Sequence, residues 1–283
     1  MSIGPKQNTR VAKLPPTCRP PERLVFDLHI SRVSTARYDV LPNGDIMWAG
    51  GAFRSGGSLG HWVAYDGITF MVRGEQQLRV PLNPPWVDYG MAGYQGARYH
   101  VNRDKLCVVS GLIRTSDWRA SAMTNPIFTL DPTCRPDKRL VFQVNHHEYS
   151  FRVDVLENGE GHLIAGKKQH AWISLSGIVF YHRQKEALKL ENGWGRYNKI
   201  YRAPSLKKKG NLCVLSGLAR AYDGWVEHIA TLPEKCRPAQ RLIFSVSAHD
   251  KSQRIDVLPS GKVMWVDGAK TWVSFDGIRY GVP

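Results

Sequence analysis

Polar and apolar residues alternate in short stretches along most of the chain, and this pattern predicts strands. Residues 152–156 read Arg-Val-Asp-Val-Leu, in which polar and apolar side chains alternate, as in a strand that buries one face. A turn signal, Asn158-Gly159, comes directly after it, because glycine readily adopts the positive φ that a tight hairpin requires. Helical periodicity with capping residues is absent from the sequence. The pattern therefore predicts an all-β fold.

The same pattern occurs three times, beginning at Cys18, Cys134 and Cys236. Each copy runs from Cys-Arg-Pro through Arg-Leu-(Val/Ile)-Phe and Arg-x-Asp-Val-Leu to a glycine turn, and ends with Trp-x-x-x-(Asp/Ser)-Gly-Ile. The starting cysteines are 134 − 18 = 116 and 236 − 134 = 102 residues apart, and most of the difference lies in a longer loop at residues 52–61. Self-similarity at such a period indicates a tandem repeat.

A further matching stretch precedes only two of the copies. Residues 82–114 and 190–220 both end in Cys-Val-x-Ser-Gly-Leu-x-Arg. The first copy has no counterpart to these residues; it matches the other two only from Arg10 onward, which corresponds to the short apolar stretch that follows the motif. The complete unit is therefore about a hundred residues long, and one second half precedes two whole units. We expect tandem antiparallel β-sandwiches or small barrels. They comprise a partial repeat over residues 1–74 and complete repeats over residues 75–184 and 185–283.

Taken in order, these motifs resemble a module found near the C-termini of phage tail-fibre and tail-tip proteins, with similar modules in predicted extracellular proteins of protists. The resemblance rests on Ser-Gly-Leu-x-Arg, Arg-Leu-Ile-Phe, Arg-x-Asp-Val-Leu-Pro-x-Gly and Trp-Val-Ser-x-x-Gly-Ile, and it covers nearly the whole chain. It implies a β-sandwich at a surface or receptor-binding tip, often oligomeric, with no catalytic motif to carry over.

The five cysteines follow the repeat. Each complete unit has one in the Ser-Gly-Leu strand and one before Arg-Pro, which predicts two disulfides, Cys107–Cys134 and Cys213–Cys236. Cys18 is left unpaired or bonded to another chain. Disulfides persist in oxidising compartments, so an extracellular, cell-surface or virion-surface location is expected; five reduced, buried thiols are the alternative. No Cys-x-x-Cys spacing favours a metal site.

Charge narrows the choice of partners. The chain has 39 Lys and Arg against 24 Asp and Glu, a formal net charge of +15 that favours acidic partners. No apolar run approaches the roughly 18 residues that cross a bilayer, the first ten residues lack the apolar core of a secretory signal, and no nucleic-acid-binding motif is present. The expected partners are other protein chains and glycans, without a membrane span, and nucleic acid is disfavoured.

Candidate ligand contacts are aromatic and basic side chains outside the strand pattern. An exposed indole can stack on a sugar face, and a lysine-rich stretch can bind acidic groups. Core packing, and a solvated loop that blunts a sheet edge, are the respective alternatives. The candidates are Trp86, Trp118, Trp194, Trp225, Arg196, Lys207, Lys208 and Lys209.

The side chains that recur in all three copies are assigned structural roles. Trp62, Trp172 and Trp272 are predicted to be buried at equivalent positions of a common core. The Arg-x-Asp pairs are predicted to form cross-strand ion pairs, with a rim for sugar hydroxyls as the alternative. The pairs are Arg37 with Asp39, Arg152 with Asp154, and Arg254 with Asp256.

Nothing in the sequence supports catalysis. A glycine-rich phosphate loop, Gly-x-Ser-x-Gly and His-Glu-x-x-His are all absent. His147-Glu148 and His249-Asp250 fall at one turn of two copies and are interpreted as solvent-exposed, with metal binding or pH sensing as the alternative; no cofactor or metal is expected. The sequence predicts a non-catalytic, surface-exposed binding and assembly protein that recognises glycans or acidic polymers. A structural subunit of a filament or large assembly, and a phage tail receptor-binding protein, are the alternatives.

The partial unit lacks the strand that carries Ser-Gly-Leu. We expect that residues before about Gly74 do not form a sandwich by themselves, because an unpaired sheet edge invites another strand. They should pair with another polypeptide, or with a further stretch of the protein, and Cys18 should lie near that junction.

Overall fold

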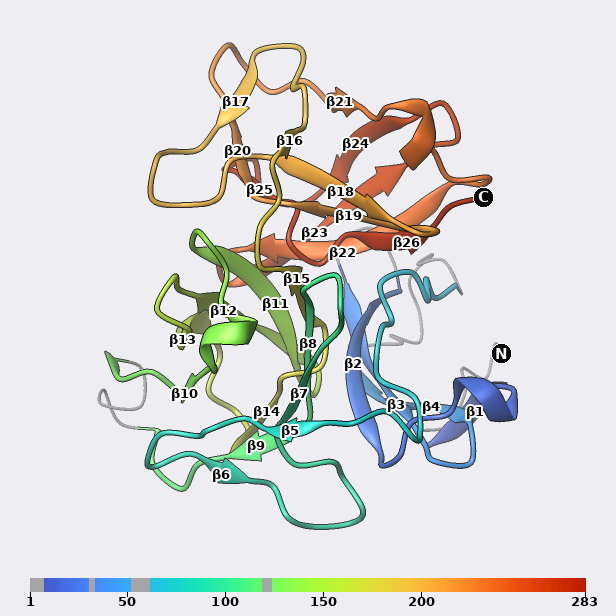
Figure 1. Ribbon diagram of the computed structural model, residues 1–283, viewed down its shortest axis with the longest axis vertical. Helices are drawn as coiled ribbons and strands as arrows, with labels where there is room; N and C mark the ends of the chain where they lie inside the picture. The colour runs from blue at the N-terminus through green and yellow to red at the C-terminus, as the bar shows by residue number, and fades with distance from the viewer. Residues whose placement is uncertain (1–7, 31–33, 52–61, 119–123) are drawn as a thin grey trace, which may run out of the picture.

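The computed structural model describes residues 8–30, 34–51, 62–118 and 124–283, and these residues form the predicted all-β fold (Figure 1). The loop predicted at residues 52–61 lies outside the described residues. Short 3-10 turns, Pro16–Cys18, Pro132–Cys134 and Glu234–Cys236, end at the three Cys-Arg-Pro cysteines. Among the described residues, no helix has the length and apolar character needed to span a membrane.

Each of the three segments 1–74, 75–184 and 185–283 contains a four-stranded antiparallel sheet with the same strand order. The orders are β1-β4-β3-β2, β10-β13-β12-β11 and β21-β24-β23-β22. The Arg-x-Asp-Val-Leu strand pairs with the strands before and after it. The strands are β1 Thr9–Lys13, β2 Leu24–His29, β3 Thr35–Val40, β4 Asp45–Gly51, β10 Phe128–Thr129, β11 Leu140–His146, β12 Tyr149–Val155, β13 Glu160–Gly166, β21 His228–Thr231, β22 Leu242–Ala248, β23 Lys251–Val257 and β24 Lys262–Asp267.

The second and third segments each add one three-stranded and one four-stranded antiparallel sheet. Their orders are β14-β9-β6 and β15-β8-β7-β5 in the second segment, and β17-β20-β25 and β16-β18-β19-β26 in the third. The strands are β5 Leu78–Arg79, β6 Val87–Asp88, β7 Arg98–Val101, β8 Leu106–Ser110, β9 Leu112–Arg114, β14 Trp172–Ser174, β15 Ile178–Tyr181, β16 Glu186–Ala187, β17 Trp194–Arg196, β18 Ser205–Lys209, β19 Leu212–Ser216, β20 Leu218–Ala221, β25 Val273–Ser274 and β26 Arg279–Gly281. In both segments the Ser-Gly-Leu stretch pairs with the strands that come after the repeated tryptophan or contain it.

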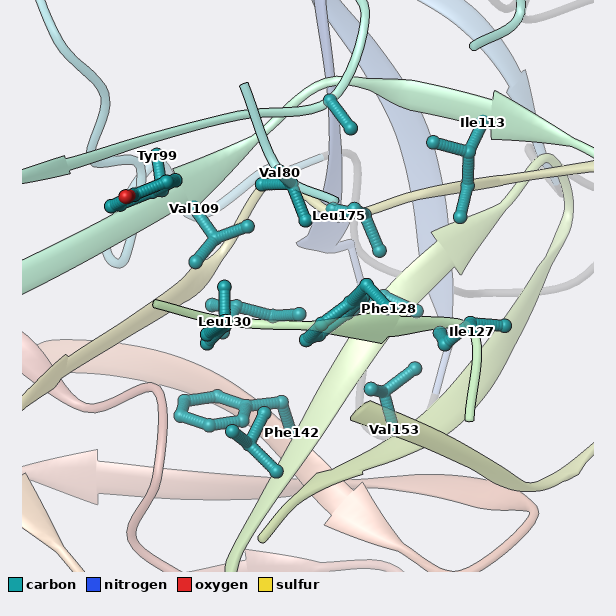
Figure 2. Close-up of a cluster of buried hydrophobic side chains, with 14 of the residues drawn as sticks. Val80, Tyr99, Val109, Ile113, Ile127, Phe128, Leu130, Phe142, Val153 and Leu175 are labelled. Carbon is teal, nitrogen blue, oxygen red and sulfur yellow. The ribbon is translucent and has the colours of Figure 1, made fainter. Parts of the chain in front are cut away.

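Each segment has its own apolar core. In the second segment, Val109, Phe128 and Phe142 from three different sheet strands converge between the layers (Figure 2). The third segment has a core of similar composition, and the first segment has a smaller one built mainly on its single sheet. The two predicted disulfides are present, with Cα–Cα distances of 5.4 Å for Cys107–Cys134 and 5.8 Å for Cys213–Cys236, inside the usual range of about 4.4–6.8 Å.

The three segments close into a ring, in which β2, β11 and β22 contact one another (Figure 1). A residue shortly after each repeated tryptophan reaches the backbone of a neighbouring segment: the second segment reaches the first, the third reaches the second, and the first reaches the third. The hydrogen bonds run from Ser174 Oγ to the Val25 carbonyl (2.7 Å), from Ser274 Oγ to the Val141 carbonyl (2.8 Å), and from the Ile243 amide to Asp66 Oδ2 (2.8 Å).

Polar groups meet at the middle of the ring. Arg279 donates to the carbonyl oxygens of Gly67, Gly177 and Gly277, which lie at the same spacing after the three repeated tryptophans. Full burial lowers the pKa of Arg279 to about 9. The guanidinium therefore joins all three segments through one side chain.

Candidate functional site

The repeated tryptophans lie between segments, so the prediction that they are buried in a common core is wrong. Each indole is half-buried. The residue after each indole packs in or against the core, and successive side chains of an extended chain point to opposite faces, so the indole faces the neighbouring segment. There it stacks on an arginine. The guanidinium carbon lies 4.9 Å from the ring centroid for Arg37 and Trp172, 5.1 Å for Arg152 and Trp272, and 5.1 Å for Arg254 and Trp62.

We call these three contacts the first, second and third seams, in that order. A cation above an aromatic face contributes about 0.5–2 kcal/mol, depending on how far it is desolvated. The same contact thus holds the first segment to the second, the second to the third, and the third to the first.

A buried carboxylate fixes each seam arginine. Arg152 donates to both oxygens of Asp154, at 2.6 and 2.7 Å, and Arg139 adds a third bond at 2.7 Å. Burial by itself lowers the pKa of Arg152, but the Asp154 carboxylate outweighs that effect and the pKa is raised. The predicted ion pairs are present. Each carboxylate, however, is shared by two arginines: in the second segment, Asp154 binds both Arg152 and Arg139, the residue just before β11. The other two clusters are Arg23, Arg37 and Asp39, and Arg241, Arg254 and Asp256.

A tyrosine from the neighbouring segment completes the first seam. The Tyr94 hydroxyl accepts a 2.6 Å hydrogen bond from Arg37, and the Arg23 guanidinium lies 4.3 Å from the Tyr94 ring centroid. Backbone hydrogen bonds also connect the two segments: the Arg23 amide donates to the Gly93 carbonyl (3.1 Å), and the Arg23 carbonyl accepts from the Gln95 amide (3.0 Å). Tyr94 belongs to the first half of its unit.

The second seam repeats this arrangement. Tyr201 accepts a 3.0 Å hydrogen bond from Arg152, and Arg139 lies 5.0 Å from its ring centroid. The backbone of Arg139 bridges to Tyr201 in the same parallel fashion as Arg23 does to Tyr94. A first half-unit therefore covers two of the three arginine–aspartate clusters.

The third seam is open. In the described part of the chain, no tyrosine stacks on or hydrogen-bonds to Arg241 or Arg254. The side chain of Arg241 is 54% exposed, against 25% for Arg23 and 26% for Arg139. The neighbour across this seam is the first segment, and residues 1–74 contain no counterpart to residues 82–114.

The first segment also leaves an apolar edge uncovered. In the second segment, β14 and β15 pair with β9 and β8, and Ile178 and Phe180 are fully buried. The corresponding residues of the first segment, 62–64 and 68–71, form no strand with any described residue, and Ile68 and Phe70 are only half-buried. As expected, the described part of this segment contains one sheet rather than a complete sandwich.

Cys18 lies beside this edge. It is exposed and forms no disulfide, whereas its counterpart Cys134 is bonded to Cys107 on β8. The amide of Arg73 donates to the carbonyl of Arg19 (2.9 Å), so the chain just beyond Phe70 runs next to Cys18. In the other two segments, a first half-unit covers the corresponding cysteine, strand edge and seam. The first segment leaves all three uncovered.

The tryptophans predicted to bind ligand are covered. Trp86 and Trp194 are 3% and 6% exposed, so the prediction of exposed indoles is wrong for them. Trp118 and Trp225 are partly buried and pack on these two rings, with centroid distances of 5.3 and 4.6 Å. Burial in the cores therefore removes the Trp86 and Trp194 indoles from solvent.

The predicted basic residues are divided between two sheets. Lys207, Lys208 and Lys209 lie on β18, whereas Arg196 ends β17. Lys207 Nζ lies 4.0 Å from the centroid of the Tyr181 ring, and Lys209 is 3.8 Å from the Asp104 carboxylate. Lys207 and Lys209 therefore contact the second segment.

One cluster was missed from the sequence. His147 and Glu148, interpreted as solvent-exposed turn residues, meet His170 from a loop before β14, and one ligand atom from each lies within 4.8 Å of the others. Only the fold brings His170 to the turn. The one feature of the sequence that could have indicated this cluster is the large number of histidines in the second segment.

No protein-family model, no curated protein and no solved structure matches this chain. Its function is therefore inferred from the geometry of its own seams and edges.

Proposed function

We propose that this chain is a non-catalytic assembly protein that binds a half-unit supplied by another polypeptide or by a further stretch of this protein. The uncovered edge at residues 62–71 carries the proposal, because the corresponding residues are paired strands in both complete segments. An edge with free backbone groups and apolar side chains gains from pairing with an added strand.

The two complete segments define the chemistry of the donated half-unit. Cys107 lies opposite Phe180 in the strand pairing, so the donated strand would place a cysteine opposite Phe70 and within reach of Cys18. A tyrosine that precedes this strand would stack on Arg241, as Tyr94 stacks on Arg23. One segment would then cover the edge, the thiol and the third seam together.

The two disulfides support a location in an oxidising compartment outside the cytoplasm, and we propose that the assembly forms there. Recognition of glycans, the other function expected from the sequence, gains no support, because the indoles proposed to stack on sugars lie in or against the cores.

A peptide of residues 93–114, which carries Tyr94 and Cys107, tests the proposal as a probe added to the intact chain. We expect saturable binding by fluorescence anisotropy. In a buffer of reduced and oxidised glutathione, in which oxidised glutathione accepts the two electrons, we expect a mixed disulfide between the peptide and Cys18. Phe70→Lys, which places a charge on the edge, should weaken binding at least tenfold.

Ile200→Lys is the matched control, since Ile200 is 61% exposed and lies outside the proposed edge. It should bind the probe as the wild-type chain does. Cys18→Ser should lose the covalent product and keep reversible binding. An unchanged affinity in Phe70→Lys, or no binding to the wild-type chain, contradicts the proposed function.

A further inference from the structure

We infer that His147, Glu148 and His170 form a binding site for a divalent transition-metal ion of the zinc type. Glu148 Oε2 lies 3.0 Å from His170 Nε2 and 3.7 Å from His147 Nε2. Two imidazoles and one carboxylate are a ligand set that zinc accepts, with a fourth position left for water or another ligand. All three side chains are partly exposed, so an ion can enter from solvent.

The turn that presents two of the ligands is held in a fixed conformation. His147 has a φ of 63°, which non-glycine residues adopt uncommonly. The buried side chain of Asn145 maintains it, because Asn145 Oδ1 accepts from the His147 amide and Nδ2 donates to the His147 carbonyl, both at 2.9 Å. A positive φ is what a two-residue hairpin turn such as the one between β11 and β12 requires.

A buried histidine, His146, fixes the third ligand. His146 Nδ1 donates to the Trp172 carbonyl (2.6 Å), and its Nε2 accepts from the amides of Gln169 and His170, both at 3.1 Å. The loop that carries His170 is thereby tied to the turn that carries His147 and Glu148. The donor atoms are positioned before an ion arrives, which reduces the ordering that binding requires.

The third segment offers an internal comparison. His249 and Asp250 stand at the corresponding turn, and His249 has a similar φ of 66°. Lys270, two residues before the repeated tryptophan, replaces the third ligand, His170. An ammonium group has no lone pair to donate to a metal ion, so this turn lacks a complete ligand set.

Binding should also tie two segments together. A Cβ on Gly50 would lie 2.2 Å from His147 Cε1, so the imidazole sits directly on β4 of the first segment. An ion held by His147 would therefore stiffen the first seam as well as the turn.

Calorimetric titration of the full-length, disulfide-intact chain with zinc at pH 7.5 tests the inference. One ion per chain should bind, and cobalt in its place should give the absorption bands of a tetrahedral site. His170→Lys, which copies the third segment, should weaken zinc binding at least a hundredfold, and Glu148→Gln should weaken it in the same direction. His162→Gln is the control, because His162 pairs with Glu160 at 3.0 Å and is not part of the cluster.

Absence of binding to the wild-type chain, or equal affinity in the wild-type chain and in both His170→Lys and Glu148→Gln, overturns the assignment. Circular dichroism and the urea midpoint of each variant show whether it is folded. If one substitution unfolds the chain, the other decides the outcome.

Discussion

The guanidinium carbon of Arg254 lies 5.1 Å from the centroid of the Trp62 ring, so the last segment of the chain stacks on the first. The same contact joins Arg37 to Trp172 and Arg152 to Trp272. Each segment stacks its tryptophan on one neighbour and binds the tryptophan of the other neighbour with its arginine, so the three segments close into a ring. A half-unit can therefore be held at two of its sides, even though its own sandwich is incomplete.

Removal of a seam indole should destabilise the whole ring. We expect Trp272→Ala to lower the free energy of unfolding by about 2–4 kcal/mol, through lost stacking on Arg152 and lost apolar burial. Trp272→Phe keeps an aromatic face and should cost clearly less. Urea titration followed by circular dichroism measures both. Equal losses for alanine and phenylalanine would show that the ring face contributes nothing.

The disulfides should contribute to stability, and the unpaired cysteine should not. Cys213 and Cys236 are 23 residues apart, and closing a loop of that length stabilises a chain by about 3 kcal/mol in the loop-entropy account. The double substitution Cys213→Ser with Cys236→Ser should lose about that amount in a urea titration. Cys18→Ser is the control, and a comparable loss there would contradict the assignment of Cys18 as unbonded.

His146 should make stability depend on pH between about 6.5 and 4. Burial lowers its pKa from 6.5 to about 4, so the unfolded chain binds a proton in this window and the folded chain does not. Stability is therefore full above pH 6.5 and is lost as pH falls towards 4, by about 3 kcal/mol for this group.

His146→Gln tests that pH dependence, since a neutral amide can donate to the Trp172 carbonyl but does not titrate. The difference in unfolding free energy between pH 7 and pH 4.5 should shrink in this variant. If the difference stays the same, other groups cause the acid sensitivity.

The sequence predicted the strands and turns because both depend on local geometry. Period-two alternation gave the all-β fold, and glycine marked the hairpin turns. Gly44, Gly159 and Gly261 adopt φ values of 90°, 89° and 88°, and a Cβ on Gly159 would lie 2.6 Å from the Leu130 carbonyl oxygen. Only glycine fits such a position without strain, so the residue type alone indicates the backbone.

The disulfides were predictable for a different reason. Cys107 and Cys134 occur together in a complete unit, as do Cys213 and Cys236, and the partial unit has only Cys18. This joint occurrence was enough to predict which cysteines pair, although the distances between them were unknown. The incomplete sandwich of the first segment could be predicted from the same comparison, because the residues that pair with β14 and β15 elsewhere have no counterpart there.

The sequence by itself thus determined which strands form, where they turn and which cysteines pair, since each depends on neighbouring residues or on comparison between copies. Only the tertiary structure decided where the repeated side chains point. Trp172 faces Arg37 of another segment, Trp86 enters a core, and His170 joins His147. The physical reason is that alternation gives the two faces of a strand, but packing between segments decides what each face meets.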